Sequence, residues 1–334
     1  MAHVIPFRGL RYNREIIPDL AAVVSPPYDV ITPAQQEELL SRHPQNAIHI
    51  DYGPKQPGDD DDNNSYSRAA AALGQWLRQK TLMPEDEPAF YYLKEEFTGH
   101  DGQPAMREGF FAAVKLAEFA EGIILPHEVT ASGPKTDRLR LMEATEANLS
   151  PIFCLYSDPE LKVAGVLRAE TTRKPDISLT DDAGTRHSLW VIAGEPATLV
   201  TAALKDKSLL IADGHHRYET ALSYRNARRQ KDNPGESERP YDYLMVYLSH
   251  MEDTSQSILP IHRLVKGLST QTLADLPALL EKDFGVEEIT VAAADRAQTM
   301  IDRQKAVSGE HNAFGIYLPA TRQYFLIVAR LPRP

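Results

Sequence analysis

The chain contains a single cysteine, Cys154, among its 334 residues. An intrachain disulfide and a zinc site built on thiolates are therefore excluded, and a reducing cytoplasm is the expected compartment. The first residues show no basic segment followed by an apolar run, so we expect no signal peptide. No stretch approaches the roughly 20 apolar residues that a membrane helix needs. We therefore expect a cytoplasmic protein with no membrane partner.

Basic residues are also fewer than acidic ones. Lys and Arg number 36 against 47 Asp and Glu, which gives a formal net charge of −11. This balance disfavours nucleic acid as a partner, because such binding depends on neutralising phosphates. It permits a local basic pocket for a small phosphate ligand. The length exceeds what one hydrophobic core usually organises, so two domains are expected. An oligomer is compatible with the sequence.

Residues 209–222, LLIADGHHRYETAL, carry a dense polar cluster. The apolar run 209–212 predicts the end of a buried strand, and Asp213 is expected to cap a helix with Tyr218 on its buried face. The start of a helix offers free backbone N–H groups and a positive dipole end, to which phosphate commonly binds. The alternative is a surface turn with solvated side chains. The residues assigned to phosphate binding here are Gly214, His215, His216 and Arg217.

A second polar cluster follows the apolar run 123–125. We expect a short strand there that delivers His127 and Glu128 to a loop, and then a helix from Thr136 to Ala147. Lys135 and Arg138 would add positive charge for a phosphate. Taken alone, the His–Glu pair is a weak signal, and a salt bridge from Glu128 to a neighbour is then the favoured interpretation.

Turn signals and apolar periodicity predict the remaining elements. Pro26 and Pro27 exclude a helix, and the segment through Tyr28 and Asp29 is read equally as a rigid turn or a ligand-contacting loop. The four consecutive carboxylates of 59–62 lack the glycine and terminal glutamate of a calcium loop, so a solvated loop is expected. Further strands are expected at 45–51, 90–93, 109–114, 152–155, 188–192, 243–248, 258–264, 313–318 and 323–329, an exposed loop at 229–240, and further helices at 33–40, around 70–77, at 273–281 and at 292–304.

Six segments together resemble a widespread bacterial family labelled as a domain of unknown function. They are PPYDVI at 26–31, LPHE at 125–128, DR at 137–138, NLSPIF at 148–153, ADGHHRYETA at 212–221 and LPIHR at 259–263. The resemblance covers nearly the whole chain, and its core is similar to the ParB/sulfiredoxin superfamily. Within that superfamily the nearest local match is to the free-serine kinases, which also carry a Pro-His-Glu segment and an Asp-Gly-His-His-Arg turn.

The resemblance implies an enzyme that phosphorylates L-serine to O-phospho-L-serine with a nucleotide donor and Mg²⁺. The sequence does not specify whether the donor is ATP, ADP or another nucleotide, and ATP is favoured as the common bacterial donor. It implies Glu128 as general base and Asp213 as a second catalytic acidic residue. Asp213 is also the candidate Mg²⁺ anchor, because Mg²⁺ favours carboxylates together with phosphates. His215, His216 and Arg217 are implied at the nucleotide phosphates. The residues assigned to substrate binding are Tyr28, Asp29, His127, Asn148, His262 and Arg263.

Other chemistries of the superfamily fit the residues less well. Sulfiredoxins carry a reactive cysteine where this chain has His215, and ParB proteins carry a basic DNA-binding module. The alternative function is a regulatory protein that binds a nucleotide without catalysis. The predicted fold class is α/β (α+β), with an N-terminal α/β region at 1–120, a ParB/sulfiredoxin-like mixed-sheet core at 121–265 and a small C-terminal α/β unit at 266–334.

Overall fold

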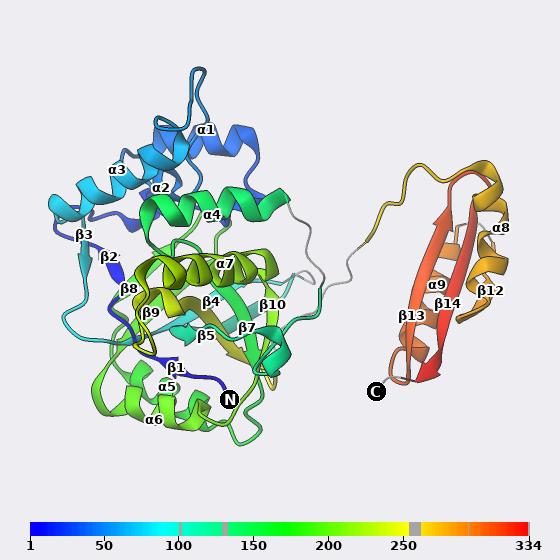
Figure 1. The fold of residues 1–334 in the computed structure, drawn as a ribbon. Helices are drawn as coiled ribbons and strands as arrows, with labels where there is room; N and C mark the ends of the chain where they lie inside the picture. Colours follow the sequence, from blue (N-terminus) through cyan, green and yellow to red (C-terminus); the bar gives the residue numbers. More distant parts are fainter. Residues whose placement is uncertain (100–101, 129–132, 254–261, 293, 333–334) are drawn as a thin grey trace. The chain divides into compact units, whose positions relative to one another are not determined.

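The computed structural model describes residues 1–99, 102–128, 133–253, 262–292 and 294–332. The chain divides into two compact units, Met1–Ser257 and Ile258–Pro334, which are described separately (Figure 1). Both combine helices with strands, which confirms the predicted α/β class.

A nine-stranded mixed sheet forms the centre of the first unit. Its strand order is β6-β10-β7-β11-β5-β4-β9-β8, with β1 paired to β5. The β6–β10 and β7–β11 pairs are parallel, and the other pairs are antiparallel. Strands from both sides of residue 120 pair in this sheet. Their bounds are β1 Val4–Ile5, β4 Phe90–Thr98, β5 Pro104–Lys115, β6 Ile124–Leu125, β7 Ile152–Tyr156, β8 Ile177–Thr180, β9 Arg186–Ile192, β10 Leu209–Asp213 and β11 Tyr243–His250.

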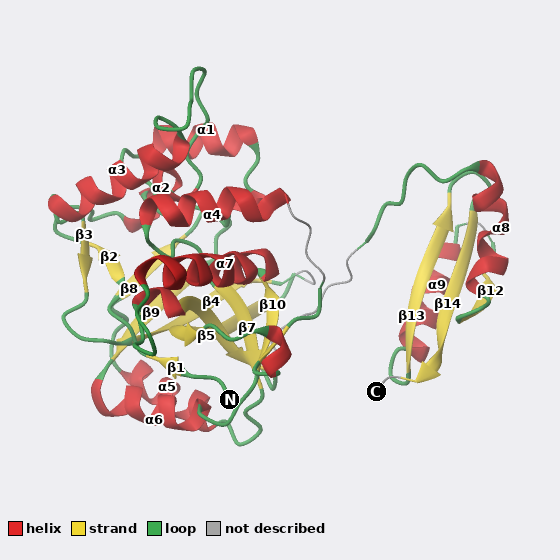
Figure 2. Ribbon diagram, in the orientation of Figure 1, coloured by secondary structure: helices red, strands yellow, loops and turns green. Residues whose placement is uncertain are grey.

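Helices lie on both sides of this sheet (Figure 2). Helix α7 lies along the sheet with α4 over it and α1–α3 beyond α4, whereas α5 and α6 lie on the other side. The bounds are α1 Pro33–Arg42, α2 Ile48–Asp51, α3 Ser65–Arg78, α4 Gly133–Thr145, α5 Lys162–Ala169, α6 Gly194–Leu204 and α7 His215–Asp232. Across the described part of the chain, no helix combines the length and apolar character needed to span a membrane.

Short elements complete the first unit. A two-stranded sheet pairs β2 Leu10–Tyr12 with β3 Leu82–Pro84. Single 3-10 turns are η1 Leu20–Ala22, η2 Tyr28–Val30, η3 Phe119–Glu121, η4 Glu170–Thr172 and η5 Pro240–Asp242.

The buried face of α7 fixes this helix against the sheet. Tyr218, Ala221 and Leu222 are all buried, as the helical spacing predicts. The Tyr218 hydroxyl donates to the carbonyl of Ala117 at 2.7 Å and accepts from the N–H of the same residue at 3.0 Å. Both polar groups of a buried tyrosine are thereby satisfied. The first turn of α7 is consequently held in one position at the end of β10.

The strand expected at 45–51 is wrong. Asn46 is fully buried, its amide nitrogen donates to the carbonyls of Ala22 and Val24, and its Oδ1 accepts from the N–H of Ile48. That last bond begins the short helix α2. The exposed loop expected at 229–240 is also wrong in its first part, because α7 continues to Asp232.

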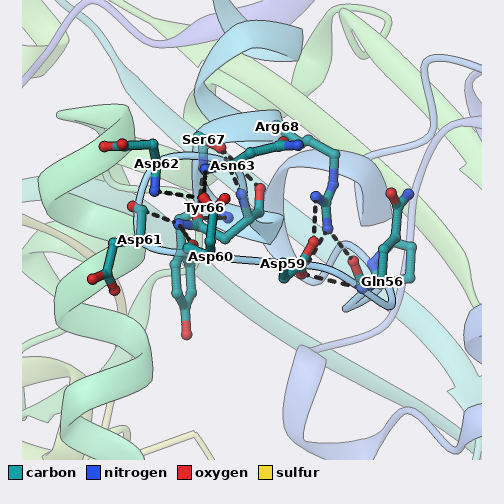
Figure 3. Close-up of polar contacts among 11 residues, drawn as sticks. Gln56, Asp59, Asp60, Asp61, Asp62, Asn63, Tyr66, Ser67 and Arg68 are labelled. Carbon is teal, nitrogen blue, oxygen red and sulfur yellow. Dashed lines mark hydrogen bonds and ion pairs between the residues drawn. The ribbon is translucent and has the colours of Figure 1, made fainter.

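The acidic loop before α3 is held by its own chain (Figure 3). Asp59 forms a two-bond ion pair with Arg68 at 2.7 and 3.0 Å. Asp60 Oδ1 accepts the backbone N–H groups of Asp62 and Asn63. Within the described residues, no group of three or more His, Cys, Asp or Glu side chains is arranged to hold a metal ion.

The second unit is a three-stranded antiparallel sheet with two helices. Its strands are β12 Phe284–Glu288, β13 His311–Leu318 and β14 Gln323–Pro332 in the order β12-β14-β13, and its helices are α8 Thr270–Leu280 and α9 Arg296–Val307. The sequence predicts both helices, β13 and β14, but not β12. The strand expected at 258–264 is wrong at 262–264, where the chain is exposed and irregular, and 258–261 lie outside the described residues.

Candidate functional site

The junction between β10 and α7 is the predicted strand–turn–helix. Gly214 connects the two elements with φ +94°, a backbone conformation that favours glycine. The N-cap expected at Asp213 is wrong: Asp213 is the last residue of β10, and Gly214 is the N-cap. The Asp213 carboxylate is used by Arg217 instead. Gly214, as N-cap, makes no side-chain bond to the backbone N–H groups in the first turn of α7.

The parallel pairing of β6 with β10 brings the two polar clusters together. Leu209 lies beside Ile124 and Leu210 beside Leu125, so the chain leaves both strands at the same end of the sheet. The backbone N–H of His127 donates to Nε2 of His215 at 3.1 Å. The two imidazole rings meet edge to face with their centroids 4.5 Å apart.

His215 is a buried imidazole, with 4% of its surface exposed. Its Nε2 accepts a hydrogen bond, which assigns the proton of the neutral ring to Nδ1. Burial lowers the pKa of His215, and the charge of His127 lowers it further, while the negative charges of Glu128, Asp213 and Glu219 oppose the shift. The environment therefore favours a neutral ring. The alternative of a fully solvated turn is wrong for this residue.

Arg217 ties three segments of the sheet edge together. Its side chain is 11% exposed, and its guanidinium donates to the carbonyl of Pro151 and to Asp213 Oδ2. These bonds join the start of β7, the end of β10 and the first turn of α7. The Tyr28 ring lies 5.9 Å from the guanidinium carbon.

His216, the neighbour of Arg217, is half-buried, and its Nε2 is buried without a hydrogen-bond partner in the described part of the molecule. A buried polar atom without a partner is unusual in a folded protein.

Arg138 is the second buried arginine of the site. Its side chain is 8% exposed and donates to Asp137 at 2.9 and 2.7 Å, and to the carbonyl oxygen and Oδ1 of Asp51 at 3.0 and 3.2 Å. The Tyr28 ring packs 4.0 Å from its guanidinium carbon. Two carboxylates already balance the Arg138 charge, so this arginine holds the site together.

Asp51 is a site residue that sequence reasoning missed. Ser150 Oγ donates to its Oδ2 at 2.8 Å. Burial raises the pKa of Asp51, although the nearby charge of Arg138 and the bond from Ser150 act in the opposite direction. The segment 45–51 gives no local sign of this role, because both partners lie far along the chain. For Ser150 the sequence did give an indication, because this residue belongs to the NLSPIF segment at 148–153.

A small cavity of about 30 Å³ joins these residues. It unites Arg138, Asn148 and Arg217 from the sequence prediction with Asp51 and Ser150.

Other predicted site residues lie elsewhere or outside the described part. Glu128 is exposed next to His127, and Asp29 is exposed on η2. The Lys135 side chain lies outside the described residues. His262 and Arg263 belong to the second unit and are exposed within it.

The fold and site define a mixed-sheet α/β protein with a partly buried, polar strand–turn–helix junction. Residues 4–332 match the model of a family described as "Protein of unknown function (DUF1015)", and the chain belongs to this family. This confirms the expected membership of a domain-of-unknown-function family. Neither the curated proteins nor the solved structures contain a match to the chain.

Proposed function

We propose that the protein is an ATP-dependent kinase that phosphorylates free L-serine to O-phospho-L-serine. The observation that carries the proposal is the parallel β6–β10 pair, which brings the His127–Glu128 segment beside the Asp213–Arg217 turn. The resemblance to free-serine kinases described above supplies the acceptor. L-serine and a nucleotide are the proposed partners.

The start of α7 is suited to hold phosphate groups. Its first turn combines backbone N–H groups that its N-cap residue Gly214 does not cap, the positive end of an 18-residue helix and the guanidinium of Arg217. Arg217 uses two of the five N–H donors of its guanidinium for the bonds to Pro151 and Asp213. The remaining donors would meet phosphate oxygens. Catalysis of phosphoryl transfer consists mainly of such positioning and charge stabilisation.

Glu128 is the proposed base for the acceptor. Glu128 is exposed, and its negative charge interacts electrostatically with His215 at the turn. It would take the proton of the serine hydroxyl as the serine oxygen forms a bond to the terminal phosphorus. The bond from that phosphorus to the bridging oxygen breaks, and ADP leaves with the electron pair.

Asp213 fits a metal ion that arrives with the nucleotide. Its side chain is 65% exposed, and one oxygen is held by Arg217. Mg²⁺ in nucleotide sites often uses only one or two carboxylates together with phosphate oxygens. Such an ion would neutralise phosphate charge when bound, with Asp213 as the anchor.

The direct test is incubation of the protein with ATP, Mg²⁺ and a panel of amino acids that includes serine, threonine and homoserine. The expected result is ADP release and phosphoserine formation that both require serine. ADP release with a different small molecule would replace the acceptor and leave the phosphate site standing.

A second candidate is a regulatory protein that binds a nucleotide without turnover. It is favoured by the Arg217–Asp213 pair, since Asp213 is engaged before any ligand arrives. Tight ATP binding without ADP release for any acceptor would select this function over the kinase.

A further inference from the structure

A cavity of about 600 Å³ adjoins the small cavity at Arg217 and has no role in the chemistry described above. Its walls come from α4 and the residues that follow it, from α7, from η5 with the preceding Arg239, and from the start of β11. Met142, Ala147 and Asn148 line both spaces, so the two cavities are neighbours. The volume lies within the range of about 300–1,000 Å³ that is typical of small-molecule sites.

Aromatic rings and a guanidinium give the large cavity its chemical character. Tyr224, Tyr241 and Tyr243 line it. The Arg228 guanidinium carbon lies 5.8 Å from the centre of the Tyr224 ring and 5.5 Å from that of Tyr241. Nucleobases stack on aromatic side chains and on the planes of arginine guanidinium groups, and this stacking depends little on which base is present.

The formal charges around the large cavity cancel, because two arginines face two carboxylates. Arg228 pairs with Glu146 at 2.5 Å and with Asp232 at 3.3 Å, and Arg239 also lines the space. This balance does not select an anion, so it suits a neutral planar group. The Arg228 Nε is buried and has no hydrogen-bond partner among the described residues. A ligand acceptor would satisfy that donor.

One face of α7 connects the large cavity to the proposed phosphate site. Arg217, Thr220, Tyr224 and Arg228 recur on it at intervals of three or four residues, and all four line one of the two cavities. The helix rises about 16 Å between Arg217 and Arg228, at 1.5 Å per residue. The Asn148 amide, which both donates and accepts, stands where the two spaces meet.

We infer that the large cavity binds the nucleobase of the nucleotide whose phosphates lie at Arg217. This inference rests on the proposed function for the phosphate half of the ligand. The face of α7 then carries the whole nucleotide, with its charged end at the first turn and its neutral ring among the tyrosines.

Calorimetry with ATP and with inorganic tripolyphosphate, each with Mg²⁺, separates the two halves of the ligand. Tyr241→Ala removes a stacking ring, and Tyr241→Phe is the matched control that keeps it. We expect Tyr241→Ala to weaken ATP binding roughly 5- to 150-fold and leave tripolyphosphate binding within about twofold of wild type. Tyr241→Phe should bind both as wild type does. Arg217→Ala should weaken both ligands.

Two results would overturn the inference and leave the phosphate site intact. One is equal affinity of the wild-type protein for ATP and tripolyphosphate, and the other is unchanged ATP affinity in Tyr241→Ala. Failure of both ligands to bind the wild-type protein would remove the proposed function and the inference together.

Photolabelling of the wild-type protein with an azidoadenine derivative of ATP gives a readout that does not depend on a variant folding. The label is expected within residues 142–148 or 221–243, which line the large cavity. A label confined to other segments contradicts the inference.

Discussion

The backbone N–H of His127 donates to Nε2 of His215 across 88 positions of sequence, at 3.1 Å. This bond closes the gap between the loop after β6 and the first turn of α7. It also requires an unprotonated Nε2 on a buried ring, because a protonated nitrogen cannot accept a hydrogen bond. Protonation of His215 at Nε2 would therefore break this hydrogen bond between the two polar clusters.

The first prediction is that low pH destabilises the protein through His215. Burial, and then the charge of His127, lower the pKa of His215 below its usual value, while Glu128, Asp213 and Glu219 oppose this. The stabilisation by the neutral ring is fully present above about pH 6.5, the unfolded-state pKa, and is lost as the pH falls through the lower folded value. His215→Gln keeps an acceptor and removes the titration. Denaturant unfolding at pH 7.5 and pH 5 should show a larger loss of stability in wild type than in this variant.

Charges elsewhere in the protein cancel in that comparison, because wild type and variant share them. An equal loss of stability in both proteins would show that His215 does not carry the pH response.

The second prediction concerns the two roles of Arg217. Arg217→Ala should weaken ATP binding strongly, because a charge-assisted and often bidentate contact is lost. It should also cost about 1–3 kcal/mol of folding free energy, because the Pro151 carbonyl loses its donor. Arg217→Lys keeps the charge without the fork and should recover only part of the affinity. Calorimetry at a temperature well below the melting point separates the two effects, and unchanged affinity in Arg217→Ala would remove the phosphate site.

The third prediction is that Glu128 and Asp213 act as one catalytic unit. Glu128→Gln should lower kcat about 10²–10⁴-fold with nucleotide affinity nearly unchanged. Asp213→Asn should lower kcat and raise the Mg²⁺ requirement. The double variant should be little worse than the worse single one, because residues that act together are not additive.

Glu118→Gln is a matched control for Asp213→Asn. Glu118 pairs with Arg225, which lies on α7 as Arg217 does. The side chains of Glu118 and Arg225 are 55% and 13% exposed, against 65% and 11% for Asp213 and Arg217. Loss of either partly exposed pair should cost at most about 1 kcal/mol. Equal activity in Glu118→Gln and Asp213→Asn, or full turnover in Glu128→Gln, would leave these carboxylates as structural groups.

Local patterns predicted the elements that carry the site. The apolar run 209–212 and the helical spacing of Tyr218, Ala221 and Leu222 are properties of a few neighbouring residues, and the structure has β10 and α7 there. The N-cap was wrong because the nearby Arg217 competes for the Asp213 carboxylate, and β10 extends one residue further with an irregular register before Asp213.

Contacts between segments far apart in the chain could not be predicted from local sequence patterns. Alternation at 45–51 resembles a strand, yet the buried Asn46 side chain is anchored by bonds to the carbonyls of Ala22 and Val24 and starts a helix by accepting the N–H of Ile48. Asp51 then becomes a site residue only because α4 brings Arg138 beside it. The β6–β10 pairing is equally non-local, and no spacing in either segment specifies it.

The last prediction tests whether the conformation of Gly214 positions Arg217. A Cβ at Gly214 would lie 2.8 Å from Cγ2 of Ile152 and 3.1 Å from Nε of Arg217, on a backbone with φ +94°. Gly214→Ala therefore combines left-handed strain of about 1–2 kcal/mol with crowding of about 1–3 kcal/mol. Gly122→Ala is the matched control, because Gly122 has φ +66° and its added Cβ would meet nothing within 4 Å. Denaturant unfolding should show a larger loss of stability for Gly214→Ala than for Gly122→Ala. ATP affinity should fall only in Gly214→Ala, because only that methyl group displaces the arginine. If both variants lost the same stability and kept the same affinity, the close approach at Gly214 would have no part in the site.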